Sequence, residues 1–140
     1  MAAATNASLR ARREEIVRRH VDAESNHDVA GVLATFHQPR YDVVPLGAVS
    51  DGAAAVEGLV TGLLAGFPDF KAEILTMHHS DTAVILEVRM TGTQNGPWAG
   101  IEPTGRPMDV RVACIFEFDE DRLMCEKVYF DFATLQRQLG

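Results

Sequence analysis

The chain has 140 residues, of which 46% are hydrophobic, so it can form one domain with a single core and is not expected to be disordered. Its formal net charge of −7, from 13 basic and 20 acidic residues, disfavours nucleic acid and anionic membranes as partners. No apolar run approaches the roughly 20 residues of a membrane span, and the start of the chain lacks the apolar stretch of a signal peptide, so a cytoplasmic protein is expected.

Helical periodicity runs through the first half of the chain. Apolar side chains recur at three-to-four spacing over residues 8–27, which predicts a helix after a flexible start at 1–8. Asp28 is placed to cap a second, short helix, and a third helix is expected over residues 53–64. Between these two helices, residues 41–44 predict a short strand. Five arginines of the first helix are expected to form a solvated face: Arg10, Arg12, Arg13, Arg18 and Arg19.

The second half of the chain alternates with a period of two, as strands do. Strands are predicted over residues 70–79, 83–93, 108–118 and 123–131, with a Gly- and Pro-rich loop at 96–107. Helices followed by antiparallel strands indicate the α+β class, with one domain over 1–140. A sheet of four long strands and one short one must cover its apolar face. It is therefore expected to curl over the N-terminal helices as a cone with a pocket.

Asp131 ends the last predicted strand and precedes a short amphipathic tail. If its carboxylate is buried, desolvation raises its pKa and makes it a general base near neutral pH. The alternative is that Asp131 caps the terminal helix, and the strand by itself favours the cap. Tyr129 shares the face of Asp131 on an ideal strand. Its hydroxyl could donate to an enolate, or the ring could pack in the pocket wall.

A series of short motifs in the second half resembles one known family. The motifs are 92–96 (Gly-Thr-Gln-Asn-Gly), 98–100 (Trp-Ala-Gly), 103–106 (Pro-Thr-Gly-Arg), 129–131 (Tyr-Phe-Asp) and 138–140 (Gln-Leu-Gly). Together they are similar to the SnoaL-like polyketide cyclase (ester cyclase) family of the nuclear transport factor 2-like superfamily, over residues 14–140. The resemblance implies a cone-shaped, cystatin-like α+β barrel that closes a polyketide ring by an aldol reaction without metal or cofactor. It also implies that Asp131 abstracts the proton.

Four further side chains are candidates for contacts with a substrate. His20 and Glu24 lie one helical turn apart, where they could carry protons in the cavity or hydrogen-bond each other at its edge. Gln94 stands where the family often has a histidine, and the chain has no histidine after His79. Trp98, the only tryptophan, could be a platform for substrate, a buried hinge or a dimer contact.

These patterns favour a cofactor-independent cyclase or isomerase that acts on a small hydrophobic, polyketide-like carbonyl compound, with Asp131 as its base. The main alternative is a non-catalytic ligand-binding or assembly protein, because this superfamily includes both kinds. A third hypothesis is a hydrolase that activates water through Glu24 and Gln94.

Two further expectations concern metals and partners. Cys114 and Cys125 flank a predicted turn without the spacing of a zinc site, so we expect free thiols and no bound metal. Ile85, Ala113 and Ile115 place apolar groups among charges on the outer face of the sheet. This pattern predicts a homodimer through that face, in which charged side chains form a ladder.

Overall fold

The computed structural model describes residues 2–140 and contains the three expected N-terminal helices. The N-terminal helices are α1 (Ala2–Ser25), α2 (Val29–Ala34) and α3 (Ala53–Gly66). A fourth helix, α4, covers Phe132–Leu139, and a 3-10 turn, η1, covers Val44–Leu46. Helix α1 begins earlier than predicted and includes the part of the chain that we expected to be a flexible start. Asp28 caps α2 as predicted, because its carboxylate accepts a hydrogen bond from the amide of Gly31 at 2.9 Å. No helix among residues 2–140 is both long and apolar enough to span a membrane.

The sheet has six strands, one more than the sequence predicts. They are β1 (Arg40–Val43), β2 (Ala48–Asp51), β3 (Lys71–His79), β4 (Ala83–Thr93), β5 (Pro107–Asp119) and β6 (Arg122–Tyr129), in the spatial order β2-β1-β6-β5-β4-β3. All neighbours are antiparallel except β1 and β6, which are parallel. The sequence missed β2 because this short edge strand has no buried residue and therefore no apolar alternation.

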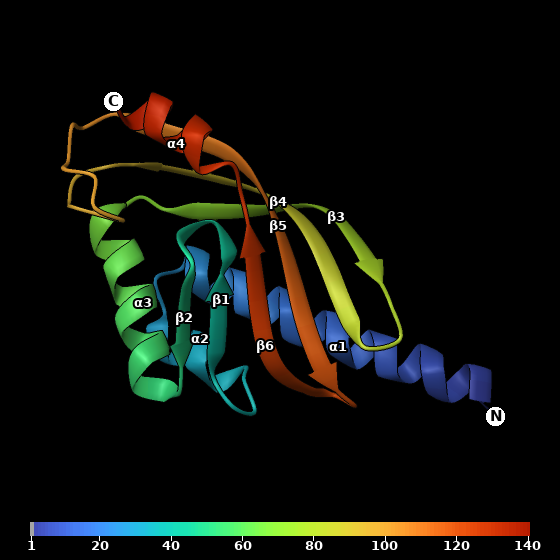
Figure 1. The fold of residues 1–140 in the computed structure, drawn as a ribbon. Helices are drawn as coiled ribbons and strands as arrows, with labels where there is room; N and C mark the ends of the chain where they lie inside the picture. Colours follow the sequence, from blue (N-terminus) through green and yellow to red (C-terminus); the bar gives the residue numbers. More distant parts are fainter. Residues whose placement is uncertain (1) are drawn as a thin grey trace.

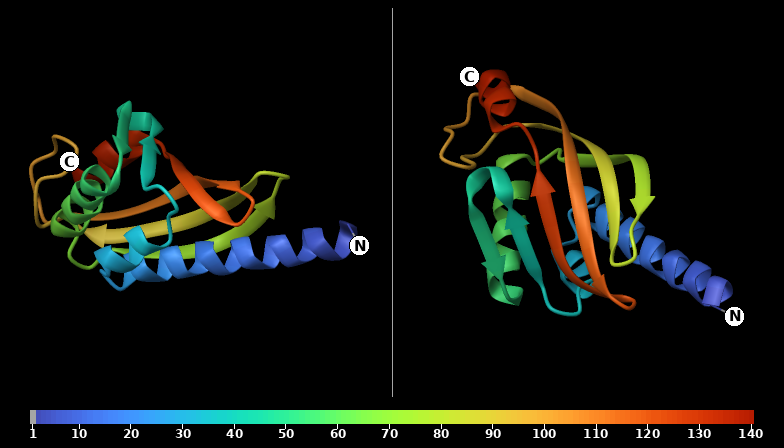
Figure 2. Two further views of the ribbon diagram at one scale, coloured as in Figure 1. Left: turned by 90° about the horizontal axis from the view of Figure 1, so that it is seen from below. Right: turned by 45° about the vertical axis from the view of Figure 1, so that its right-hand side comes forward.

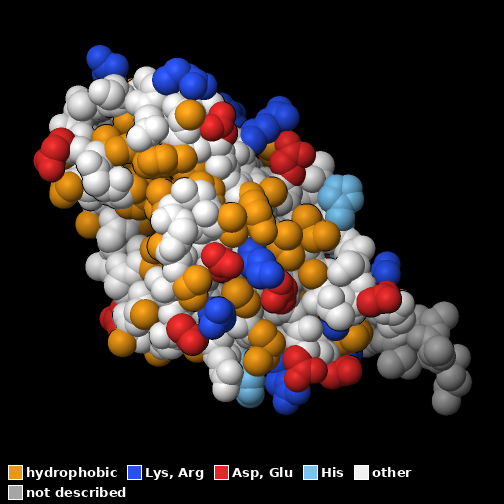
Figure 3. Space-filling model, viewed as in Figure 1, with side chains coloured by type: hydrophobic (Ala, Val, Ile, Leu, Met, Phe, Trp, Pro, Cys, Tyr) orange, Lys and Arg blue, Asp and Glu red, His pale blue; other side chains and the backbone are white. Residues whose placement is uncertain are grey.

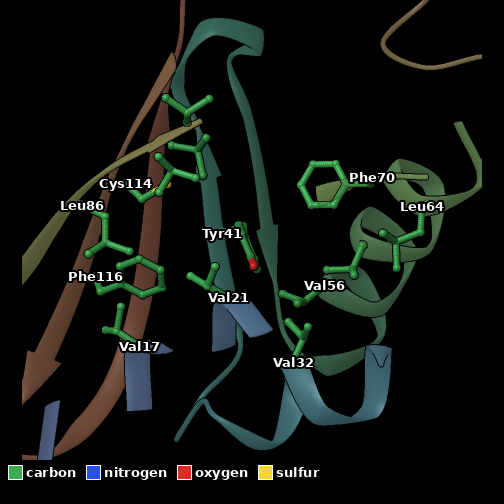
Figure 4. Packing of buried hydrophobic residues seen from close by; sticks show 14 of the residues in the cluster. Val17, Val21, Val32, Tyr41, Val56, Leu64, Phe70, Leu86, Cys114 and Phe116 are labelled. Carbon is green, nitrogen blue, oxygen red and sulfur yellow. The ribbon is translucent and has the colours of Figure 1, made fainter. Parts of the chain in front are cut away.

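The sheet curls around α1, which crosses its concave side, while α3 lies beside β1 and β2 and α4 lies at the far end (Figures 1 and 2). The core fills the space between the helices and the concave face of the sheet. Figure 4 shows Val17 and Val21 on the α1 side of this space, with Phe116 of β5 and Leu86 of β4. The predicted α+β cone is therefore confirmed.

Arg13 holds α1 across the sheet. Its Nε donates to the carbonyl of Glu120 at 2.7 Å and its Nη1 donates to the carbonyl of Asp81 at 2.9 Å, so one side chain binds the turns of both hairpins. The guanidinium also lies over the ring of Phe118, 5.4 Å from its centroid. The prediction that Arg13 belongs to a solvated face is wrong, because these turns bury it.

Strand β6 carries a β-bulge that decides which of its side chains face the core. Phe118 pairs with Leu123, whereas the preceding Glu117 pairs with Cys125, so Met124 is an extra residue on β6. After the bulge, Glu126 points into the cone. Tyr129 points out and is 41% exposed. Our prediction placed Tyr129 and Asp131 inside because it continued the alternation from Leu123 without the extra residue, and this part of the prediction is wrong.

Candidate functional site

Four polar side chains from three elements meet in the buried interior of the cone. His20 and Glu24 come from successive turns of α1, Tyr41 comes from β1, and Glu126 comes from β6. Nε2 of His20 lies 3.0 Å from Oε1 of Glu24, 3.0 Å from Oε1 of Glu126 and 2.7 Å from the hydroxyl oxygen of Tyr41. The hydroxyl of Tyr41 donates to Oε1 of Glu24 at 2.6 Å. All four residues are buried, so these contacts are shielded from water.

Thr35 sets the protonation state of His20 from the opposite side of the ring. Its hydroxyl donates to the carbonyl of Val32 at 2.6 Å, so its oxygen accepts at 2.8 Å from Nδ1–H of His20. Nε2 then faces the oxygens of Glu24 and Glu126, and a proton on Nε2 lets it donate to both carboxylates. The geometry therefore favours an imidazolium cation between two carboxyl groups.

The pKa values of the cluster follow from burial and from these contacts. Burial by itself lowers the pKa of His20, but hydrogen bonds and charges from Glu126 and Glu24 outweigh it and raise the pKa to about 10. Burial raises the pKa of Glu126 to about 7, although its hydrogen bond to His20 acts in the opposite direction. Burial and the two carboxylates raise the pKa of Tyr41 well above its usual value, so Tyr41 keeps its proton. Glu126 is therefore the member of the cluster that exchanges a proton near neutral pH.

The cluster closes one end of a cavity of about 100 Å³ inside the cone. Three of its lining side chains carry polar groups from the cluster, namely Glu24, Tyr41 and Glu126. The remainder of the lining is hydrophobic: Val43, Leu46, Leu59, Val60, Leu63, Met90, Trp98, Met108, Val110, Val112, Val128, Phe130 and Leu135. No lysine or arginine is among the lining residues. The cavity is thus an apolar chamber with a proton-exchanging carboxyl group at one end.

Asp131, our predicted base, caps helix α4 instead. Its carboxylate accepts from the amide of Ala133 at 3.1 Å and from the hydroxyl of Thr134 at 2.7 Å. The side chain is exposed, and the hydrogen bonds from Thr134 hold its pKa below the usual value. The expectation of a buried carboxyl group with a raised pKa is wrong for Asp131. The capping alternative is confirmed.

The other candidates divide between the site and its support. His20 and Glu24 belong to the cluster, and Trp98 lines the apolar end of the cavity. Gln94 is fully buried, but its amide donates to the carbonyl of Ile101 at 2.8 Å and it is not among the lining residues. Tyr41 and Glu126 were not predicted. The sequence did offer one indication of Glu126, a glutamate among the apolar residues of β6. The bulge is not visible in the sequence, so the alternation did not show that this side chain points into the core.

One set of side chains has the composition of a metal site. Within residues 2–140, His20, Glu24 and Glu126 form the only group of three whose ligand atoms lie within 4.8 Å of one another. A metal bound by His20 would need a bare nitrogen at Nε2. The two carboxyl groups instead favour a proton on that atom. The hydrogen-bonded cluster therefore accounts for the arrangement without a metal.

The family model of the SnoaL-like polyketide cyclases matches residues 14–139. Among solved structures, a putative SnoaL-like polyketide cyclase from Jannaschia sp. CCS1 is 19% identical, with a TM-score of 0.82 and 92% of each chain covered. AclR, a putative hydroxylase from Streptomyces galilaeus, is 21% identical with a TM-score of 0.78, over 93% of this chain and 96% of AclR. An LEH-like epoxide hydrolase from M. tuberculosis is 18% identical with a TM-score of 0.73, over 92% of this chain and 90% of the hydrolase.

No curated protein matches the sequence. The three solved structures named above are each less than 25% identical to this chain and show a common fold. The family match covers most of the chain, including every residue of the buried cluster. The protein is therefore a member of the SnoaL-like polyketide cyclase family, with an NTF2-like α+β fold.

Proposed function

We propose that the protein is a cofactor-independent enzyme that moves a proton on a carbon next to a carbonyl group, in a small hydrophobic compound. The observation that carries this proposal is the buried carboxyl group of Glu126, which faces an apolar cavity and has a pKa raised to about 7. A general base is most effective when its pKa is near the working pH. The base expected at Asp131 is thus assigned to Glu126.

The neighbours of Glu126 supply the other requirements of such a reaction. When Glu126 takes a proton from the substrate, the negative charge moves from its carboxylate to the substrate oxygen. The imidazolium of His20 does not itself line the cavity, but it stays beside the site of this charge movement, 3.0 Å from Glu126, and stabilises the charge through space among buried groups. Glu24 and Thr35 hold the imidazolium from two sides. His20 and Glu24 therefore act by fixing the electrostatics around the base.

The lining of the cavity limits the class of substrate. Because two carboxyl groups and no lysine or arginine line it, a substrate with a carboxylate or phosphate inside the cavity is disfavoured. The volume of about 100 Å³ is of the same order as the roughly 150 Å³ of an engineered cavity that holds benzene. We therefore expect a compact, uncharged carbonyl compound of about one ring, rather than a polyketide with several fused rings.

The test is exchange of the α-hydrogens of cyclohexanone with D2O, followed by proton NMR in the presence of the wild-type protein. Glu126→Gln keeps the shape of the side chain and removes the base, so the exchange rate should fall by about a hundredfold or more. Asp131→Asn is the matched control and should leave the rate unchanged. Equal rates for wild type and Glu126→Gln would refute the proposal.

A non-catalytic ligand-binding protein of the same fold remains the second candidate. It is favoured by one observation: the ring nitrogens of His20 and the hydroxyl of Tyr41 all have hydrogen-bond partners inside the cluster. A binding protein would take up cyclohexanone without accelerating its exchange, so the same experiment separates the two candidates.

The proposal includes a cytoplasmic homodimer that pairs the outer faces of two sheets. Figure 3 shows apolar side chains among charged ones on this side of the molecule. Leu75 and Tyr129 are exposed large hydrophobic residues on this face. The expected ladder of charges is present, as in the pair of Arg89 with Asp109 at 2.9 Å and the pair of Arg111 with Glu87 at 3.2 Å. Sedimentation equilibrium at micromolar concentration should give a dimer, and a monomer alone would contradict this part of the proposal.

A further inference from the structure

Trp98 lies on a tight turn that hydrogen bonds hold from several directions. The amide of Trp98 donates to the carbonyl of Ile101 at 3.1 Å, and the amide of Ile101 donates back at 2.8 Å. The side chain of Gln94 also donates to the carbonyl of Ile101 at 2.8 Å. Ala99 and Gly100 have positive φ angles of 50° and 75°, as a two-residue turn of this kind requires. The buried Gln94 thus supports the turn that presents Trp98.

The turn also packs against the end of α3 with no space between the backbones. The amides of Asn95 and Gly96 both donate to the carbonyl of Gly66, at 2.9 and 3.2 Å. A Cβ atom on Gly66 would lie 3.0 Å from Cβ of Trp98, and one on Gly96 would lie 2.8 Å from the carbonyl oxygen of Ala65. Glycine at these two positions therefore permits an approach that any other residue would prevent. The turn cannot move toward α3 to enlarge the cavity.

Aromatic neighbours fix the indole ring itself. The ring of Phe67 meets it edge to face at 5.7 Å between centroids, and Phe130, which also lines the cavity, lies 6.3 Å away. Phe132 supports Phe130 from outside the cavity lining, at 6.4 Å. The cavity lining runs from Glu126 and Val128 on β6 to Phe130 just beyond the strand, so Trp98 and Phe130 close the end opposite the carboxyl groups.

We propose that Trp98 is a specificity-determining residue that sets the largest ligand the cavity accepts. The inference rests on the cavity of the proposed function but does not depend on catalysis. Hydrogen bonds and close backbone packing fix the turn. A ligand larger than about one ring would therefore have to displace the side chains of Trp98 and Phe130, which cannot move freely. Removing the two fused rings of the indole should open space for a second ligand ring, at the end of the cavity opposite Glu24 and Glu126.

The test uses benzene and naphthalene, two probes that differ in size and contain no carbonyl group. Binding is followed by NMR of protein labelled with 13C at the methionine methyl groups. Met90 and Met108 line the cavity and report on it, while Met124 on the outer face is an internal reference. Trp98→Ala enlarges the cavity. Tyr129→Ala is the matched control, because it removes an aromatic ring from the outer face of β6 without removing part of the lining or of its support.

The wild-type protein and Tyr129→Ala should bind benzene at least about tenfold more tightly than naphthalene, since a pocket rejects a group it has no space for. Trp98→Ala should reverse this preference. A folded Trp98→Ala that keeps the wild-type preference would overturn the inference, as would a wild-type protein that binds naphthalene as tightly as benzene. Trp98→Leu provides the same comparison if the alanine variant does not fold. Because α-hydrogen exchange is measured separately, loss of the size limit and loss of the proposed catalysis are distinguishable results.

Discussion

Replacing Glu126 with glutamine should make the protein more stable near neutral pH while it abolishes proton exchange. Burial raises the pKa of this carboxyl group from 4.5 to about 7, so the folded state binds its proton more tightly than the unfolded state does. Its contribution to stability is therefore complete below pH 4.5 and is lost as the pH rises to about 7. Glutamine stays uncharged throughout this range, and its carbonyl oxygen can still accept from Nε2 of His20.

The size of the effect follows from the shift in pKa. A change from 4.5 to about 7 corresponds to at most about 3 kcal/mol, because each pKa unit is worth about 1.4 kcal/mol. The free energy of unfolding of Glu126→Gln should match that of the wild type near pH 4.5 and exceed it by up to about 3 kcal/mol at pH 7. The raised pKa of His20 adds stability that is complete below pH 6.5 and is lost as the pH rises to about 10. Below pH 6.5 this contribution is constant in the wild type, so the change in stability between pH 4.5 and 5.5 reports mainly on Glu126.

Urea unfolding of both proteins at pH 4.5, 5.5 and 7 provides the measurement. Asp131→Asn is a control in which the pKa shift has the opposite sign. Hydrogen bonds lower the pKa of Asp131, so its contribution is present above the unfolded pKa and is lost as the pH falls. Asp131→Asn should therefore differ from the wild type by a nearly constant amount between pH 4.5 and 7, because this range lies above the titration of Asp131. A Glu126→Gln variant that is less stable than the wild type at pH 7, or a difference that stays constant from pH 4.5 to 7, would refute the electrostatic account.

Three further predictions concern the support of the site and the thiols. Thr35→Val leaves Nδ1–H of His20 without its acceptor and should cost about 1–3 kcal/mol in urea unfolding, while Thr35→Ser should restore most of the loss. Asp131→Ala should lower the melting temperature because α4 loses its cap, whereas α-hydrogen exchange should be unchanged. Thiol titration of denatured, unreduced protein should find two thiols per chain, because Cys114 faces the core and Cys125 the outer side of the sheet; a single thiol or none would contradict the arrangement.

The elements that the sequence predicted correctly are those in which a periodic pattern is visible, even where a bulge shifts it, as in β6. The three N-terminal helices and the strands β3 to β6 are of this kind, and their order was sufficient to indicate the α+β cone. The edge strand β2 and the parallel pairing of β1 with β6 were missed, because neither leaves a pattern in the local sequence. Parallel pairing depends on how distant segments pack and not on the residues of either strand.

The candidate site was predicted only where local geometry determined it. His20 and Glu24 share a helix face, so their spacing placed them together before any tertiary contact was known. Glu126 reaches them from a strand about 100 residues later, and no local spacing in the sequence can show this contact. The family resemblance favoured Asp131, which lies five residues beyond Glu126 on the exposed side of the chain. Because the bulge was not recognised, the prediction assigned the base to Asp131, which caps a helix, and not to the buried Glu126.

Deletion of single residues from β6 tests this explanation of the site. If Met124 is the extra residue of the bulge, deleting it gives a regular ladder in which Leu123, Glu126 and Val128 still face the core. The variant should fold, and its free energy of unfolding should still fall between pH 4.5 and 7 as that of the wild type does, because Glu126 still reaches His20. Deleting Lys127, an outward residue beyond the bulge, should instead turn Val128 out and Tyr129 in. That variant should lose cooperative unfolding. If deleting Met124 is as damaging as deleting Lys127, the bulge is not the device that directs Glu126 into the cavity.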